Sequence, residues 1–339
     1  MTSQYCQSIF VVVMMFCSHT LGIEEQATHL RGDHVDISML RRNVDDGHPT
    51  DDFYSRDLAC RVDMVGLEGT YYYTARPENA GTVCATYLLA ESNDLVEIEF
   101  TEFDVDCSDP ENEVQFFDGW TMGYGSFPGV DDHPLTIAER VVNVCSQRSR
   151  VFRSHQNGAM ITFKLTDAAA SFAFTFRPIH NPEPCNVIAP EPSGAHTLRN
   201  YGNERNCSFS IIYPVTIHIW EMAVGGYDNG DARLRCHMGL DYVELLEGNS
   251  LDMSAMTTEG SICGHVGNIV RQNGDGDSLN RNNHIVPGES SCQSDAFSVP
   301  LMCHNSVIRL VSSSQYVNEV SFRFNRLNIA RSECPETDL

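Results

Sequence analysis

Apolar and polar residues alternate one by one along several segments of this chain. Between residues 96 and 101, three apolar residues alternate with Glu97, Glu99 and Thr101, and residues 215–219 and 320–324 show the same pattern. A period of two places one face of a β-strand in the core and the other face in water. Many short segments of this kind, separated by Gly, Pro, Asn and Asp, predict an all-β fold of antiparallel β-sandwiches. Helical signals are confined to a turn or two in "DHPLTIAER".

A Pro-rich stretch divides the chain into two parts that resemble each other. The 339 residues suit two domains. "FFDGW" (116–120) corresponds to "VELLEG" (243–248), and "SHQNGAMITFKL" (154–165) corresponds to "MCHNSVIRLVSS" (302–313). These pairs indicate a duplicated sandwich, with a first domain at 56–178, a Pro-rich linker at 179–184 and a second domain at 185–339. Residues 265–300 are rich in Gly, Asn, Asp and Ser and are predicted to form a loop insertion.

The N-terminus and the cysteines predict a secreted protein. Ile9 to Phe16 is an unbroken apolar run, too short to span a bilayer, so residues 1–22 are predicted to be a signal peptide and 23–55 a flexible leader. Of the thirteen cysteines, Cys6 and Cys17 would leave with the signal peptide. No C-x-x-C pair occurs, which favours disulfides over zinc or redox motifs. Eleven cysteines would remain, so one is left over, and spacing alone leaves the pairing open.

The charge and the missing catalytic motifs exclude several classes of function. The formal net charge of −24 argues against a nucleic-acid partner and disfavours an anionic membrane surface. The chain lacks H-E-x-x-H, G-x-S-x-G and Walker patterns, so we expect no enzyme activity and no cofactor.

The order of cysteines and strand motifs resembles CUB modules. The second half has Cys185, Cys207, Cys236, "DYVELLEG" and Cys263, and the first half has a looser version of the same pattern around "FFDGW". Taken together, "FDGW", "DHPLTIAER", "SHQNGAMITF", "PCNVIAPEPSG", "RNCSFSIIYPV", "DYVELLEG" and "VIRLVSSSQYVNEVSF" resemble the corticotropin-releasing factor-binding protein family from about residue 56 to the C-terminus. The resemblance implies two tandem CUB-like antiparallel β-sandwich (jelly-roll) domains, and the divergence suggests an invertebrate member.

The resemblance also implies covalent features. CUB cysteines pair in sequence order, and the family adds a bridge near the end. The implied disulfides are Cys60–Cys84, Cys107–Cys145, Cys185–Cys207, Cys236–Cys263 and Cys303–Cys334, with Cys292 unpaired. Asn206 lies in the one N-x-S/T sequon of the chain, and the family is glycosylated at the matching place.

The implied function is capture of a peptide hormone. The ligand would be an amidated helical peptide of the corticotropin-releasing factor or diuretic hormone class, bound by a monomer or weak dimer, with receptor signalling limited as a result. The family places importance on an Arg and an Asp that bracket the first cysteine, which map best to Arg56 and Asp63, with Arg61 as an alternative for the positive charge. An alternative function is a CUB adaptor that binds a larger extracellular protein or a protease.

Calcium is not expected in either module. Many CUB modules hold calcium with clustered acids. In the first half Asp104 or Asp106 and Asp167 could serve, but Asn112 replaces the central Asp. In the second half Asp241 is present, but its acidic partners are missing. We therefore expect no metal site.

Overall fold

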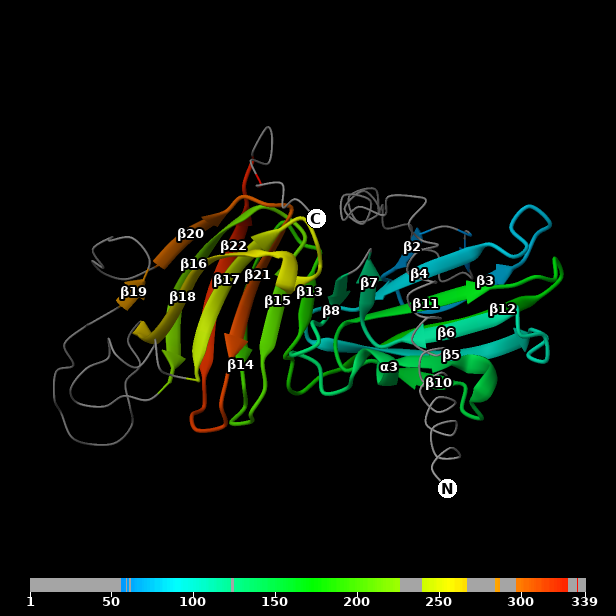
Figure 1. Cartoon of the computed structure of the whole chain (residues 1–339), viewed down its shortest axis with the longest axis horizontal. Coiled ribbons are helices and arrows are strands. Elements are labelled where there is room, and N and C mark those ends of the chain that lie inside the picture. The colour runs from blue at the N-terminus through cyan, green and yellow to red at the C-terminus, as the bar shows by residue number, and fades with distance from the viewer. Residues whose placement is uncertain are drawn as a thin grey trace, which may run out of the picture.

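The computed structural model describes residues 56–58, 60, 62–122, 125–225, 240–266, 284–286, 297–328 and 334. The signal peptide predicted at 1–22, the leader predicted at 23–55, Cys236, Cys292 and most of the predicted 265–300 insertion lie outside these residues. The described part forms two β-sandwiches that follow one another along the chain, and Figure 1 shows them side by side. The predicted all-β fold class is confirmed.

Two five-stranded sheets form the first sandwich. The first sheet has the order β1 (Arg56–Asp57), β3 (Gly69–Thr74), β12 (Ser171–His180), β5 (Asp94–Asp104), β10 (Val151–Arg153). The second sheet has the order β2 (Val62–Val65), β4 (Val83–Leu89), β11 (Gly158–Lys164), β6 (Glu113–Phe117), β9 (Val141–Asn143). Aromatic and aliphatic side chains from both sheets fill the space between them.

The alternation in β5 produces this packing, with one exception. Val96, Ile98 and Phe100 are buried in the core, and Thr101 on the other face is exposed. Glu97 also belongs to that outer face, but it is only 7% exposed. Arg153 on β10 reaches across the sheet, with its Nε 2.5 Å from Glu97 Oε2. A neighbouring strand therefore covers a carboxylate that the sequence pattern alone would place in water.

The connection between β6 and β9 carries the irregular part of the first sandwich. It contains the hairpin of β7 (Trp120–Met122) and β8 (Gly125–Phe127), followed by helix α3 (Ile137–Arg140). A capping box starts α3, because the Thr136 backbone N and Oγ1 donate to the Glu139 carboxylate at 2.9 and 2.8 Å. The 3₁₀ turn η2 (Val144–Ser146) follows β9.

The second sandwich repeats the strand order of the first. One layer has the order β13 (Val187–Ala189), β15 (Cys207–Ile211), β21 (Asn305–Val311), β17 (Tyr242–Gly248), β18 (Thr257–Val266). The other layer contains β14 (Ser193–Arg199), β22 (Glu319–Arg326), β16 (Val215–Val224), β20 (Phe297–Leu301). Strand β18 also pairs with β16, which joins the layers into one ladder, and with β19 (His284–Val286). The 3₁₀ turn η3 (Met253–Ala255) follows β17.

The two strand orders support the duplication inferred from the motifs. In each sandwich a short strand pairs in parallel with its neighbour (β2 with β4, β13 with β15), and the next two strands are β11 and β6 or β21 and β17. These are the strands that contain the matched motifs. The second sheets correspond in the same way, as β3-β12-β5-β10 and β14-β22-β16-β20.

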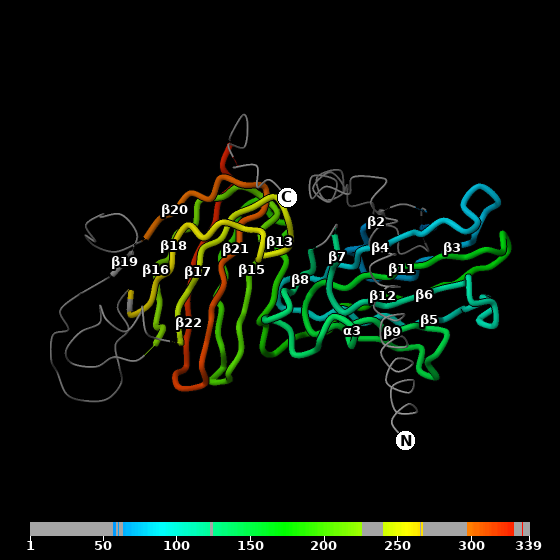
Figure 2. The backbone as a smooth tube through the Cα atoms, viewed as in Figure 1, coloured from blue at the N-terminus to red at the C-terminus, as the bar shows by residue number. Residues whose placement is uncertain are grey.

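The two sandwiches share apolar packing at their junction. Tyr87, Trp120 and Phe127 of the first unit belong to the same buried cluster as Val187 and Ile188 of the second. Figure 2 follows the chain from one sandwich into the other. Strand β12 continues through His180 and so includes the first two residues of the predicted linker, which leaves little chain between the two units.

Four disulfides lie within the described residues. They are Cys60–Cys84, Cys107–Cys145, Cys185–Cys207 and Cys303–Cys334. These pairs follow the sequential order that the family resemblance implies. Cys263 is also disulfide-bonded, and its expected partner Cys236 lies outside the described residues. Within the described residues, no helix has the length and apolarity needed to span a membrane.

Candidate functional site

The fold places Arg56 and Asp63 on one lateral edge of the first sandwich. Arg56 lies in β1, the edge strand of the first sheet, opposite Tyr71. Asp63 lies in β2, the edge strand of the second sheet, opposite Thr86. Cys60 lies between the two strands in the sequence and is bonded to Cys84 on β4. The side chains of Arg56 and Asp63, and all of Arg61, lie outside the described part of the chain.

The tyrosine cluster beside this edge is mainly a core feature. Tyr71 and Tyr73 are 3% and 4% exposed and pack inside the sandwich. The Tyr71 hydroxyl donates to Leu67 O at 2.6 Å, and the Tyr73 ring lies 4.4 Å from the Phe163 ring. Tyr72 points to the opposite face and is half-buried. Of the three tyrosines, Tyr72 is therefore the one that remains available for an external contact.

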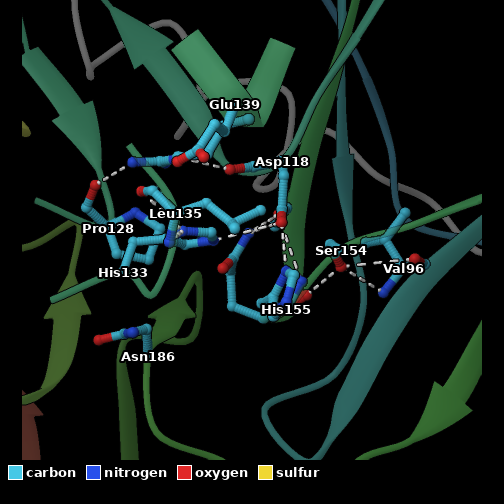
Figure 3. Close-up of polar contacts among 12 residues, drawn as sticks. Val96, Asp118, Pro128, His133, Leu135, Glu139, Ser154, His155 and Asn186 are labelled. Atoms are coloured by element: carbon cyan, nitrogen blue, oxygen red, sulfur yellow. Dashed lines mark hydrogen bonds and ion pairs between the residues drawn. The ribbon is translucent and has the colours of Figure 1, made fainter. Parts of the chain in front are cut away.

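A second site lies at the domain junction, where three separate segments bring polar side chains together. Asp118 follows β6, His133 lies in the loop before α3, and His155 lies in the turn before β11. His155 Nδ1 is 2.5 Å from Asp118 Oδ2, and His133 Nε2 is 3.2 Å from the same oxygen. Figure 3 shows both imidazoles directed at the Asp118 carboxylate. The Asp118 and His133 side chains are buried, whereas the His155 side chain is 51% exposed.

The other oxygen of Asp118 is fixed by the protein. Asp118 Oδ1 accepts hydrogen bonds from the His155 backbone N at 2.9 Å and from Gln156 Nε2 at 2.7 Å. Burial acts to raise the pKa of Asp118, but the close contacts of its carboxylate with His133 and His155 outweigh burial and hold the pKa well below its ordinary value. The hydrogen bond to Asp118 raises the pKa of His155.

The buried Arg140 side chain contacts the backbone of Asp118 and of the neighbouring hairpin. Its side chain is fully buried, and it donates to Asp118 O, Pro128 O and Phe127 O at 2.8, 2.8 and 2.9 Å. Burial lowers the pKa of Arg140 to about 10. Gly119 has φ +122°, and a Cβ at this position would collide with Phe127 O and Arg140 Nη2. Glycine is therefore required in "FDGW" for both backbone conformation and space.

The loop that carries His133 also makes the main polar contact between the sandwiches. Arg309 on β21 binds Asp132 through Nη2 at 2.7 Å and through Nε at 2.9 Å, and its Nη1 contacts Glu244 at 3.1 Å. The Arg309 and Asp132 side chains are 17% and 0% exposed. Asn186 Nδ2 donates to the Asp132 carbonyl at 2.7 Å. The loop at 128–136 thus links the Asp118 cluster to the second domain.

The sequon residue Asn206 lies at the same junction. Its Nδ2 donates to the Asp131 carbonyl at 3.0 Å, and the side chain is half-buried. A glycan attached at this nitrogen would leave one N–H, which is enough for that contact. The glycosylation predicted from sequence stays a prediction.

The residues at the CUB calcium positions are engaged in protein hydrogen bonds. Asp241 accepts from the Ser313 backbone N at 2.6 Å, Ser313 Oγ at 2.9 Å and Asn318 Nδ2 at 2.8 Å. At the equivalent place, Asn112 Oδ1 accepts from the Thr166 backbone N at 2.8 Å. These donors occupy the oxygens that calcium would need, so the residues present do not fit a calcium site.

The residues of the Asp118 cluster show no metal-ligand spacing along the chain, so the sequence pattern does not reveal the cluster. However, each residue comes from a separate family-like motif: Asp118 from "FDGW", His133 from "DHPLTIAER" and His155 from "SHQNGAMITF". The sequence signal for the cluster is that each of these three motifs contains one such polar residue in a loop. Only the three-dimensional fold brings the motifs together.

These features define a class, a pair of disulfide-bonded β-sandwiches with a shared junction. Family models match both units: the "Corticotropin-releasing factor binding protein N-terminal domain" over residues 52–180 and the "Corticotropin-releasing factor binding protein C-terminal domain" over residues 187–271. The chain belongs to the corticotropin-releasing factor-binding protein family.

Individual relatives agree with the family models. The chain is 34% identical to the human corticotropin-releasing factor-binding protein over 288 residues, covering 83% of this chain and 80% of the relative. It is 32% identical to the Xenopus laevis protein of the same name over 298 residues, covering 86% of this chain and 82% of the relative. Among solved structures, the CUB1-EGF-CUB2 domains of rat MASP-1 are similar at 11% identity, covering 79% of this chain and all of that chain with a TM-score of 0.24. The strand order given above defines the fold.

Proposed function

We propose that this chain is a secreted glycoprotein that binds an amidated, helical peptide of the corticotropin-releasing factor or diuretic hormone class and limits its receptor signalling. The main support is that family models for this binding protein match both sandwiches. The relatives are named for the same ligand. The disulfides favour an oxidising compartment. Binding alone accounts for this function, and the proposal includes no catalytic step.

The N-terminal edge of the first sandwich is the proposed contact region. Arg56 lies in edge strand β1 and Asp63 lies in edge strand β2, seven positions later in the sequence. The Cys60–Cys84 bridge ties the segment between them to β4. A rigid edge of this kind can present two opposite charges at a fixed separation. An amphipathic helical hormone would add its apolar stripe to a neighbouring surface. Half-buried Tyr72 is the nearest candidate for an aromatic anchor.

Titration calorimetry tests the proposal directly. The secreted full chain is titrated with synthetic peptides of this hormone class in the presence of a chelator. We expect one peptide per chain and a fall in heat capacity, because association buries an apolar helix face. Absence of binding at micromolar concentration would contradict the peptide-binding function and favour the CUB-adaptor alternative.

Variants at the edge test which residues make the contact. Arg56→Ala and Asp63→Asn are expected to weaken binding by about 2–5 kcal/mol if the charges are desolvated in the complex, which is roughly thirty-fold to several thousand-fold in Kd. The matched control is Asp57→Asn, because Asp57 is the exposed neighbour of Arg56 in β1. An equal loss in the control would remove the assignment of Arg56 and Asp63 while leaving the function intact.

Asn206 is the proposed glycosylation site. Treatment of the secreted protein with an N-glycosidase should lower its mass, and Asn206→Gln should abolish that change. A mass that does not respond to the enzyme would contradict the proposal. Secretion of the variant is expected to persist, because the Gln amide can still donate a hydrogen bond.

A further inference from the structure

The three side chains of the Asp118 cluster could hold a metal ion. Asp118, His133 and His155 each offer one ligand atom, and these atoms lie within 4.8 Å of one another. Among the residues that the structure describes, this is the one group of its kind. The three atoms come from three different loops, and Figure 3 shows them converging on one point.

The His133 imidazole is positioned for coordination. Its side chain is 0% exposed. Nδ1 lies 3.0 Å from the Leu135 backbone N and 3.2 Å from the Leu135 carbonyl O. The Leu135 backbone N–H donates to Nδ1, which leaves the ring proton on Nε2. Coordination through Nε2 would therefore require this proton to leave or to move to Nδ1, where the Leu135 carbonyl could accept it. Nε2 forms no hydrogen bond of normal geometry within the described chain, although it lies 3.2 Å from Asp118 Oδ2. A backbone carbonyl that holds the remote nitrogen of a ligating histidine is a common arrangement at metal sites.

The Asp118 carboxylate is also held in a fixed orientation by hydrogen bonds. The His155 backbone N and Gln156 Nε2 both donate to Asp118 Oδ1, which fixes the orientation of the group. Oδ2 is left facing the two imidazoles. Half-exposed His155 forms the solvent side of the cluster, so an ion can enter there and keep a water molecule as a fourth ligand.

The donor set selects the class of ion. Two imidazole nitrogens and one carboxylate suit Zn²⁺ and similar divalent transition metals, whereas calcium and magnesium require more oxygen ligands. The buried Arg140 guanidinium donates to the Asp118 carbonyl and adds a positive charge behind the site. That charge opposes the ion, so we expect binding weaker than at a structural zinc site with thiolate ligands.

We propose that Asp118, His133 and His155 bind one divalent transition metal ion, with Zn²⁺ as the expected ion. Entry of the ion would separate His155 Nδ1 from Asp118 Oδ2 and replace their hydrogen bond by two coordination bonds, and the proton of that hydrogen bond would move to solvent or to His155 Nε2. Because His133 shares its loop with Asp132, which binds Arg309 of the second domain, the ion would also stabilise the domain junction. This proposal is independent of the peptide-binding function.

The experiment uses the full secreted chain without an affinity tag. Zn²⁺ is titrated in competition with a chromophoric chelator, and Co²⁺ is added separately to record the visible absorption of the bound ion. The variants are His155→Asn and His133→Asn. The matched control is His180→Asn, because the His180 side chain is 77% exposed and lies 3.9 Å from Asp94, away from the Asp118 cluster. His155→Asn is the main variant, since its half-exposed position makes it compatible with folding.

We expect wild type and His180→Asn to bind one more equivalent of Zn²⁺ than His155→Asn, or to bind it at least tenfold more tightly. Zn²⁺ should raise the Tm of wild type and of the control more than that of His155→Asn. The Co²⁺ absorption should be lost in both cluster variants. Equal Zn²⁺ binding in wild type, His155→Asn and His180→Asn would overturn the proposal, as would a lack of stoichiometric binding in wild type.

Discussion

His196 has a lowered pKa because of buried surroundings that the neighbouring sequence does not reveal. It lies in β14 opposite Phe322, and its ring centroid is 4.6 Å from that of Phe209. Its Nε2 is buried and has no hydrogen-bond partner within the described part of the chain. Desolvation therefore lowers the pKa of His196 to about 4.

This low pKa predicts acid sensitivity. An unfolded histidine titrates near pH 6.5, so below that pH the unfolded chain binds a proton that the folded chain does not. Stability is therefore retained above about pH 6.5 and is lost as the pH falls toward about 4. Between pH 7 and pH 5, the free energy of unfolding should fall less in His196→Phe than in wild type, by on the order of 2 kcal/mol. Urea unfolding at the two pH values measures the effect.

A matched variant separates this effect from general acid destabilisation. His180→Asn changes an exposed histidine of the first sandwich and should leave the pH dependence as in wild type. If His196→Phe shows the same loss of stability between pH 7 and pH 5 as wild type, the buried neutral histidine is not responsible.

At the scale of elements, the alternating pattern and the duplicated motifs predicted the two sandwiches, because burial of one strand face is a local property of the sequence. The β7–β8 hairpin was not predicted as a separate element. Its role depends on tertiary contacts: Trp120 is fully buried, its Nε1 donates to Leu88 O at 3.0 Å, and its ring packs edge-on against Tyr87 at 5.3 Å. The Asp118 cluster escaped prediction for the same reason, since its ligand atoms meet only after three loops are folded.

The burial of the hairpin predicts that the two tryptophans of the chain contribute very differently to the stability of the protein. Trp120→Ala should destabilise the protein by about 3–5 kcal/mol, because it empties a core position that both sandwiches share. Trp220 is 38% exposed on β16, and Trp220→Ala should cost less than about 1 kcal/mol. Denaturant unfolding followed by circular dichroism measures both values.

Fluorescence provides an independent check of the same placement. In Trp220→Phe the remaining emission comes from Trp120 and should be blue-shifted, as for an indole without water contact. It should shift to the red only with global unfolding. A red-shifted native spectrum, or equal costs for the two alanine variants, would contradict the burial of the hairpin in the junction.

At the scale of the whole molecule, the junction combines a shared apolar cluster with one buried ion pair. The apolar cluster contains Trp120 from the first sandwich and Ile188 from the second. The ion pair joins Asp132 to Arg309, with Glu244 as a further acceptor. Burial raises the pKa of Asp132, and the Arg309 guanidinium opposes that increase. The pair fixes the loop at 128–136, and so also the position of His133, against the second domain.

This arrangement predicts that loss of Arg309 destabilises the protein more than loss of Asp132. Arg309→Ala leaves a fully buried Asp132 carboxylate without its cation and should cost about 3–5 kcal/mol. Asp132→Ala leaves Arg309 paired with Glu244, so its cost should be smaller. The double variant should be less destabilised than the sum of the single variants, because neither charge is then left alone. Thermal and denaturant unfolding of the three variants and wild type form the complete cycle.

The exposed pair on the first sandwich serves as the control. Arg177 Nη1 lies 3.0 Å from Glu99 Oε2, and the two side chains are 45% and 40% exposed. Arg177→Ala should therefore cost less than about 1 kcal/mol. If Arg309→Ala is as mild as Arg177→Ala, or if the Asp132 and Arg309 effects are simply additive, the ion pair does not hold the two domains together. In that case the shared apolar cluster and the hydrogen bonds that cross the junction, such as that from Asn186 to the Asp132 carbonyl, account for their association.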